Sequence, residues 1–305
     1  MSKGVHRFAL LVAGATFFLI IAGANVTSHD AGLAVPDWPL SFGKFFPKMV
    51  GNVFWEHGHR LIATTVGLLT IALAVYLQVR EKRSWVKRLG WIALGGVIAQ
   101  GLLGGLTVKM NLPLAVSAAH ATLAQLFFLT TVSLAVFTSK SWFEPASEVL
   151  EERDGVSLQT LSVVALIVIL VQLVLGATLR HSATWNRPLP SSLLLAHVGG
   201  AVTVTFVLGL TALTVFAKYR SETYLTRPAL IAVLLLAVQL LLGVAAYITR
   251  LRSPNDPQPL NPMISITVAH VACGALVFAA AIVLTLRAFR ILRVERTAYV
   301  LAPAA

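Results

Sequence analysis

Cysteine and acidic residues are scarce in this chain of 305 residues. Its single cysteine, Cys273, excludes an internal disulfide and a cysteine-rich metal site. Only 12% of the residues are charged, which is roughly half the share found in soluble domains. Asp and Glu together number 12, against 24 Lys and Arg. These absences exclude a soluble enzyme, a disordered chain and a disulfide-rich secreted domain.

Apolar residues dominate what remains. They make up 57% of the chain, and the mean hydropathy is +0.82. Stretches of about 20 apolar residues predict membrane-spanning helices, because a lone segment in lipid must satisfy its backbone hydrogen bonds internally. The predicted spans are 7–27, 58–80, 86–108, 115–138, 157–179, 191–217, 227–249 and 264–287. We therefore expect an all-α polytopic membrane protein.

Basic residues are distributed unequally between the two sides of the membrane. With eight spans, 16 of the 24 Lys and Arg residues fall on the side that holds both termini. Cytoplasmic loops carry the excess of positive charge in membrane proteins, so both termini are predicted to be cytoplasmic. The net charge of +12 then reflects topology, and we expect no nucleic-acid partner.

Histidines and glutamines reveal an internal repeat. Each even-numbered span has a histidine near its outer start: His59, His120, His197 and His270. Gln100, Gln172 and Gln239 begin a Gln-x-x-x-Gly sequence in three of the preceding spans, whereas the first span has only Gly23. The repeating unit is thus a helical hairpin, which predicts two pseudo-symmetric four-helix bundles. The predicted division is 1–140 for the N-terminal half, 141–156 for a cytoplasmic linker, 157–290 for the C-terminal half and 291–305 for a cytoplasmic tail.

Histidines within membrane spans are costly and usually face a bundle interior. Two imidazoles on neighbouring helices can bind one heme iron from its two faces. Four histidines at one depth therefore favour two bis-histidine heme sites, one in each half. A proton relay and plain packing are the alternatives. A bare zinc or copper site fits less well, because such sites need three or four ligands close together.

Glu56 stands three residues before His59 and is the only carboxylate next to any of the four histidines. If the helix begins early, this spacing places both residues on one face. Glu56 then either moves a proton or stabilises positive charge, or it complements the helix dipole. His57 is expected to be a loop or capping residue.

Cationic residues and glycines also gather near the histidines. The cations are candidate partners for heme propionates or interfacial residues whose charges reach the headgroups: Arg60, Lys109, Arg180, Arg250 and Arg252. The glycines either leave room for a flat macrocycle or allow close helix packing: Gly101, Gly104, Gly105, Gly199 and Gly200.

The first outer loop, at about residues 28–55, contains Ala-Gly-Leu-Ala-Val-Pro-Asp-Trp-Pro-Leu-Ser-Phe-Gly from position 31 to 43. Together with Glu56-His-Gly-His59-Arg60 and the three later histidines, this sequence resembles heme A synthase over nearly the whole chain. The resemblance implies an integral membrane oxidoreductase that oxidises the C8 methyl group of heme O to a formyl group, for cytochrome oxidases. It implies successive hydroxylation, with water as the source of oxygen.

The same resemblance implies the roles of the site residues. His59 and His120 would hold the substrate heme, His197 and His270 would ligate a heme b cofactor, and Glu56 would be catalytic. It also implies a prokaryotic plasma membrane, heme sites toward the outer side and heme O synthase as a partner. Many bacterial members have a cysteine pair in the first outer loop, where this chain has Val35 and Ser41.

Two other functions are compatible with the four histidines. One is a quinol-linked, di-heme b-type electron-transfer protein, and the other is a heme carrier. Neither explains Glu56 or the long first outer loop. The sequence leaves the electron acceptor open, as well as assembly into a homo-oligomer.

Overall fold

The computed structural model describes residues 3–143, 150–152, 156–182, 189–252 and 260–294. These residues contain eight helices that are long and apolar enough to cross a membrane, which confirms the predicted polytopic helical fold. The long helices are α1 (Lys3–Ser28), α2 (Asn52–Arg80), α3 (Ser84–Lys109), α4 (Leu114–Phe137), α6 (Leu158–Ser182), α7 (Ser191–Lys218), α8 (Thr223–Arg252) and α9 (Asn261–Ile291). The short helix α5 spans Lys140–Phe143, and the strands β1 (Leu150–Glu152) and β2 (Leu292–Val294) pair in parallel.

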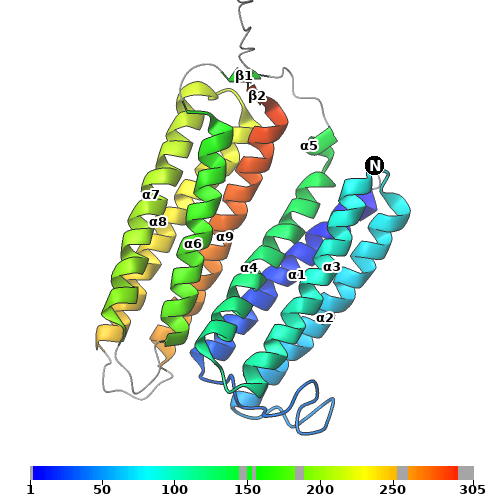
Figure 1. Cartoon of the computed structure of the whole chain (residues 1–305), viewed down its shortest axis with the longest axis vertical. Coiled ribbons are helices and arrows are strands. Elements are labelled where there is room, and N and C mark those ends of the chain that lie inside the picture. Colours follow the sequence, from blue (N-terminus) through cyan, green and yellow to red (C-terminus); the bar gives the residue numbers. More distant parts are fainter. Residues whose placement is uncertain (1–2, 144–149, 153–155, 183–188, 253–259, 295–305) are drawn as a thin grey trace, which may run out of the picture.

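The long helices form two groups that lie side by side (Figure 1). Helices α1 to α4 pack together, and so do α6 to α9, while α1 and α4 contact α6 and α9 along the seam. The start of α1 and the end of α9 lie at one end of the molecule with α5, and the segment between α1 and α2 lies at the other (Figure 1). Parts of the predicted linker 141–156 and tail 291–305 lie outside the described residues.

Each half has an apolar core of its own. The first core draws Val12, Leu73, Ala93 and Leu134 from its four helices. The second draws Ile169, Leu208, Leu236 and Phe278 from α6, α7, α8 and α9. A smaller cluster of Ile20, Phe128 and Ala275 joins α1, α4 and α9 across the seam. Packing of this kind holds membrane helices together, because lipid removes the hydrophobic drive to associate.

At the end that holds α5, two arginines tie helix ends together. Arg287 of α9 is 8% exposed and donates hydrogen bonds to the carbonyl oxygen of Ser141 (2.9 Å) and to its Oγ (2.6 Å). Arg83 donates to the carboxylate of Glu81 and to the carbonyl oxygen of Phe137. The hydrogen bonds from Arg83 hold the pKa of Glu81 below its ordinary value.

Helices α2 and α3 pack closely where Leu77 meets Gly90. Leu77 is fully buried, and its Cδ1 lies only 2.8 Å from the position of a Cβ on Gly90. Leu77→Ala should lower the free energy of unfolding by about 2–5 kcal/mol, because it leaves a cavity beside this glycine. Unfolding in mixed detergent micelles, followed by helicity, measures the change. Val79→Ala is the control, since Val79 is 72% exposed; equal losses in both variants would contradict the packing.

Candidate functional site

The four repeated histidines lie within the first three turns of α2, α4, α7 and α9. Each ring packs against a glycine of the helix that precedes it. A Cβ on that glycine would stand about 3 Å from Cε1 of the histidine: 3.1 Å for Gly23 and His59, 3.1 Å for Gly104 and His120, 2.9 Å for Gly176 and His197, and 3.1 Å for Gly243 and His270. A side chain at any of these positions would crowd the ring at the helix crossing.

Three of the histidines also contact the glutamine one turn before that glycine. Gln100 Nε2 donates to the carbonyl oxygen of His120 (2.9 Å) and lies 3.4 Å from its Nε2. Gln172 Nε2 contacts the carbonyl oxygen and Nδ1 of His197 at 2.9 and 3.1 Å. Gln239 Nε2 lies 3.3 Å from Nε2 of His270. The repeat seen in the sequence is therefore a repeated three-dimensional contact.

The histidines of the second half face each other across their bundle. The ring centroids of His197 and His270 are 6.3 Å apart, and the ring planes are inclined by 72°. Two imidazoles on opposite sides of one metal ion, each with a bond of about 2 Å, place their centroids roughly 6–6.5 Å apart. The pair therefore fits a shared heme iron.

In the first half, the rings of His59 and His120 pack on glycines of α1 and α3. Among the described residues, Nδ1 of each ring is buried without a hydrogen-bond partner. A buried imidazole nitrogen without a hydrogen-bond partner is costly, so its presence requires an explanation. Binding of a ligand by the ring is one such explanation, because imidazole is a common metal ligand. No three metal-ligating side chains gather anywhere in the described ranges, so these pairs suit a heme, which supplies four ligands itself, better than a bare ion.

Glu56 lies inside α2, because this helix begins at Asn52, six residues before the predicted span. Its side chain is 3% exposed. Oε2 accepts a hydrogen bond from the backbone N–H of Val35 (2.7 Å), and Oε1 accepts one from Arg60 one turn later. The early start satisfies the condition for Glu56 and His59 to share a helix face.

Arg60 fastens the first outer loop to α2. Its Nη1 donates to the carbonyl oxygens of Asp37 (2.7 Å) and Leu40 (2.9 Å), and Nη2 donates to that of Val35 (3.1 Å) and to Glu56. These bonds engage both terminal nitrogens of the guanidinium. The propionate contact expected of Arg60 stays a prediction.

The loop also reaches α3. The indole of Trp38 packs against Gly105 of α3: its Cδ2 lies only 2.7 Å from the position that a Cβ on this glycine would take. His29 stacks on Trp55 at the start of α2, with ring centroids 3.8 Å apart. The missing side chain of Gly105 thus makes room for Trp38, and that of Gly104 makes room for His120. The first outer loop covers this end of the N-terminal bundle.

Sequence reasoning missed the contact between His57 and Ser41. His57 is 5% exposed, Ser41 is 1% exposed, and Oγ of Ser41 lies 2.8 Å from Nδ1 of His57. His57 is therefore part of the junction between loop and helix, although a loop or capping position was expected. No pattern along the chain signals the pair, because its two members meet only when the loop folds back.

The other cationic residues that were predicted to lie near the histidines are in the last turns of α3, α6 and α8. Lys109 lies in the last turn of α3, and Arg250 and Arg252 lie in the last turn of α8, where positive charge complements the helix dipole. Arg180 ends α6 and donates to Oγ of Ser28 (2.6 Å), which joins the two halves. The predicted contacts of these four residues with heme propionates stay predictions.

The fold and the site define a class of protein: a multi-pass helical membrane protein with a histidine in each of four hairpins and one buried carboxylate beside the first. The chain belongs to the COX15-CtaA family of cytochrome oxidase assembly proteins, whose family model matches residues 6–187.

The chain is also similar to individual bacterial proteins. It is 29% identical over 185 residues to heme A synthase of Symbiobacterium thermophilum, which covers 59% of this chain and 60% of that protein. It is 26% identical over 190 residues to heme A synthase of Bacillus licheniformis, with 60% and 61% covered. It is 32% identical over 149 residues to heme A synthase of Caulobacter vibrioides, with 44% and 41% covered. The matches thus span about three fifths or less of these relatives.

The carboxylate of Asp37 anchors the tip of the first outer loop. It accepts hydrogen bonds from the backbone N–H groups of Phe42 (2.7 Å) and Gly43 (2.8 Å), which lower the pKa of Asp37. A lowered pKa means that the anchor holds at neutral pH and is lost only as the pH falls through that lowered value.

Asp37→Ala should therefore release the loop at neutral pH. Trypsin should then cut after Lys44 or Lys48 about tenfold faster, because two charge-assisted hydrogen bonds are lost. Timed digestion with mass detection of the fragments measures the rate. Asp37→Asn, which keeps one acceptor oxygen, is the control and should lie in between. Cleavage of the alanine variant at the unaltered rate would show that Asp37 does not hold the loop.

Proposed function

We propose that this protein is a heme A synthase, an oxidoreductase of the membrane that converts heme O to heme A. The observation that carries the proposal is Glu56, buried on the same helix as His59 and oriented by Arg60 and the first outer loop. Electron transfer alone does not explain why this carboxylate is buried near a histidine of the first pair. Membership of the cytochrome oxidase assembly family and the similarity to heme A synthases support the proposal.

The two histidine pairs have different roles in this proposal. His59 and His120 bind the substrate, heme O, in the half that contains the carboxylate. His197 and His270, with ring centroids 6.3 Å apart, ligate a resident heme b. When bound, that cofactor supplies one-electron transfer. The candidate partners of the propionates remain Arg60, Lys109, Arg180, Arg250 and Arg252.

Glu56 is the group that handles protons and charge. Hydrogen bonds from Val35 and Arg60 use two of the roughly four lone-pair positions of the carboxylate. The role of the carboxylate in this proposal is to stabilise developing positive charge at the C8 methyl carbon and to accept a proton from an attacking water. Loss of two electrons and addition of water give the hydroxymethyl group. A second round gives a gem-diol, which loses water to leave the formyl group.

The setting follows from the same proposal. The protein lies in the plasma membrane of a prokaryote, with both termini in the cytoplasm and the heme sites toward the outer side. Heme O synthase supplies the substrate, and a cytochrome oxidase under assembly receives the product. The electron acceptor and assembly into a homo-oligomer are open to experiment.

Pigment analysis tests the activity. The full chain is purified from cells that also produce heme O synthase, and its hemes are extracted and separated with mass detection. Heme A or its hydroxymethyl precursor is expected beside heme b. Heme b alone, at two per chain, would instead identify a di-heme electron-transfer protein. Heme O that stays unoxidised would identify a carrier, and protein free of heme would return the histidines to packing.

Substitution of Glu56 tests its role. Glu56→Gln should retain both hemes but slow formyl formation by about 10²-fold or more, the usual contribution of a positioned acid or base. Heme content and the rate of product formation are measured on the same preparation. Glu222→Gln, at the start of α8, is the matched control. Turnover of Glu56→Gln at the rate of the control would exclude catalysis by this carboxylate.

A further inference from the structure

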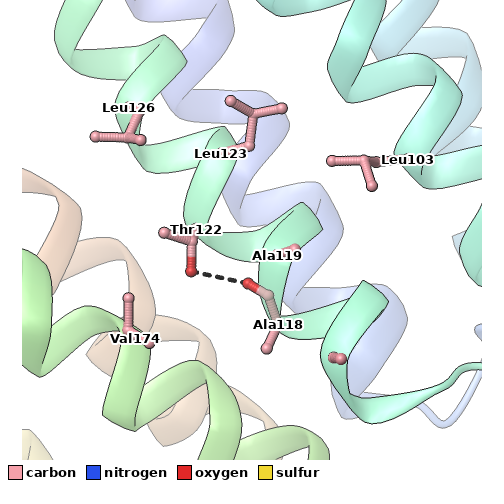
Figure 2. Close-up of a pocket in the computed structure, with 8 residues that line it drawn as sticks. Leu103, Ala118, Ala119, Thr122, Leu123, Leu126 and Val174 are labelled. Carbon is pink, nitrogen blue, oxygen red and sulfur yellow. Dashed lines mark hydrogen bonds between the residues drawn. The ribbon is translucent and has the colours of Figure 1, made fainter.

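An apolar groove of about 510 Å³ runs along α4 where the two halves meet. Its floor consists of α4 side chains, four small ones and the two leucines Leu123 and Leu126. Its walls are Leu103 of α3 and Val174 of α6, on opposite sides of α4 (Figure 2). The volume lies within the range of about 300–1,000 Å³ typical of small-molecule sites. Ala115 and Ala119 on the floor are exposed, so the groove opens into the membrane.

The lining of the groove suits a hydrocarbon. Of the described residues that form it, Thr122 is the only one with a polar side chain, and its hydroxyl donates to the carbonyl oxygen of Ala118 (2.8 Å; Figure 2). No free donor therefore remains in this lining for the carbonyl groups of a quinone ring. No cation lines it either, so a charged headgroup has no partner there.

The groove lies next to His120 on α4. Ala119 precedes His120 directly, and Leu123 follows it by one turn on the same side of α4. Across the helix pair, Leu103 precedes Gly104, the residue on which the ring of His120 packs. A ligand bound at His120 therefore lies beside the middle of the groove, which extends along α4 from Ala115 to Leu126, and a flexible chain on that ligand can enter it.

We propose that this groove holds the long isoprenoid side chain of heme O, and so selects heme O over heme b. Heme O carries this chain where heme b has a vinyl group, and the two molecules are otherwise the same at the iron and the propionates. The histidines can bind either heme, so discrimination requires a surface that only the chain can cover. The inference rests on the proposed function, because it assigns heme O to the site of His59 and His120.

The test fills the groove and compares the two hemes. The full chain in lipid nanodiscs is titrated with heme O and with heme b, followed by absorbance. Val174→Trp should weaken heme O binding about tenfold, since several buried methylene groups lose their contacts, and leave heme b within twofold. Val164→Trp is the matched control, because Val164 lies on the same helix and both valines are 39% exposed. It should change neither affinity.

A second variant guards against a local folding defect. Ala115→Phe fills the groove from its floor and should give the same selective loss. Equal weakening of both hemes, or of neither, would overturn the groove as a specificity site. Unchanged heme O binding together with loss of co-purified phospholipid would show that a lipid chain occupies it. Failure of the unaltered protein to bind either heme would instead overturn the proposed function, and this inference with it.

Discussion

The contact between a histidine ring and a glycine on the preceding helix is the constraint on which the rest of the structure depends. An imidazole in a membrane interior is costly unless its nitrogens find partners, and a flat ring reaches the bundle interior only where the adjacent helix lacks a side chain. Gly176 and His197 show the contact most closely, with 2.9 Å between Cε1 and the position of a Cβ. The same contact recurs in all four hairpins, so the two helices of each hairpin come close together at the histidine ring.

The four hairpins differ in what surrounds this contact, and the difference separates the halves. In the last three hairpins a glutamine amide holds the ring from the preceding helix. In the first hairpin that position is Leu19, and His59 has no such support. The polar contacts of the first hairpin lie instead between α2 and the first outer loop, where Glu56 binds Val35 and Arg60. The second half thus has the same glutamine support on both of its histidines, whereas the first half has a buried carboxylate beside one of its two.

The sequence predicted the features that depend on local composition. The thickness of the bilayer requires long apolar runs, so all eight spans could be located, and the Gln-x-x-x-Gly repeat pointed to the correct helix pairs. It did not predict the path of the first outer loop, because that path depends on contacts between distant residues, such as Trp38 on Gly105. Nor did it predict the strands β1 and β2, since three-residue segments leave no pattern. The roles of the four histidines and Glu56 remain proposals.

Arg60 explains how the first outer loop keeps its shape without a cysteine pair. Many bacterial sequences with a similar loop motif have cysteines at the two positions that are Val35 and Ser41 here. The guanidinium binds the carbonyl oxygen of Val35 and lies 3.4 Å from Oγ of Ser41, the two residues at the positions of that pair. Most of its bonds go to backbone carbonyls, which are present whatever the side chains. The same guanidinium orients Glu56, so the carboxylate and the loop are held by one group. A chain without thiols at these positions therefore keeps both the cover of the site and the orientation of its carboxylate.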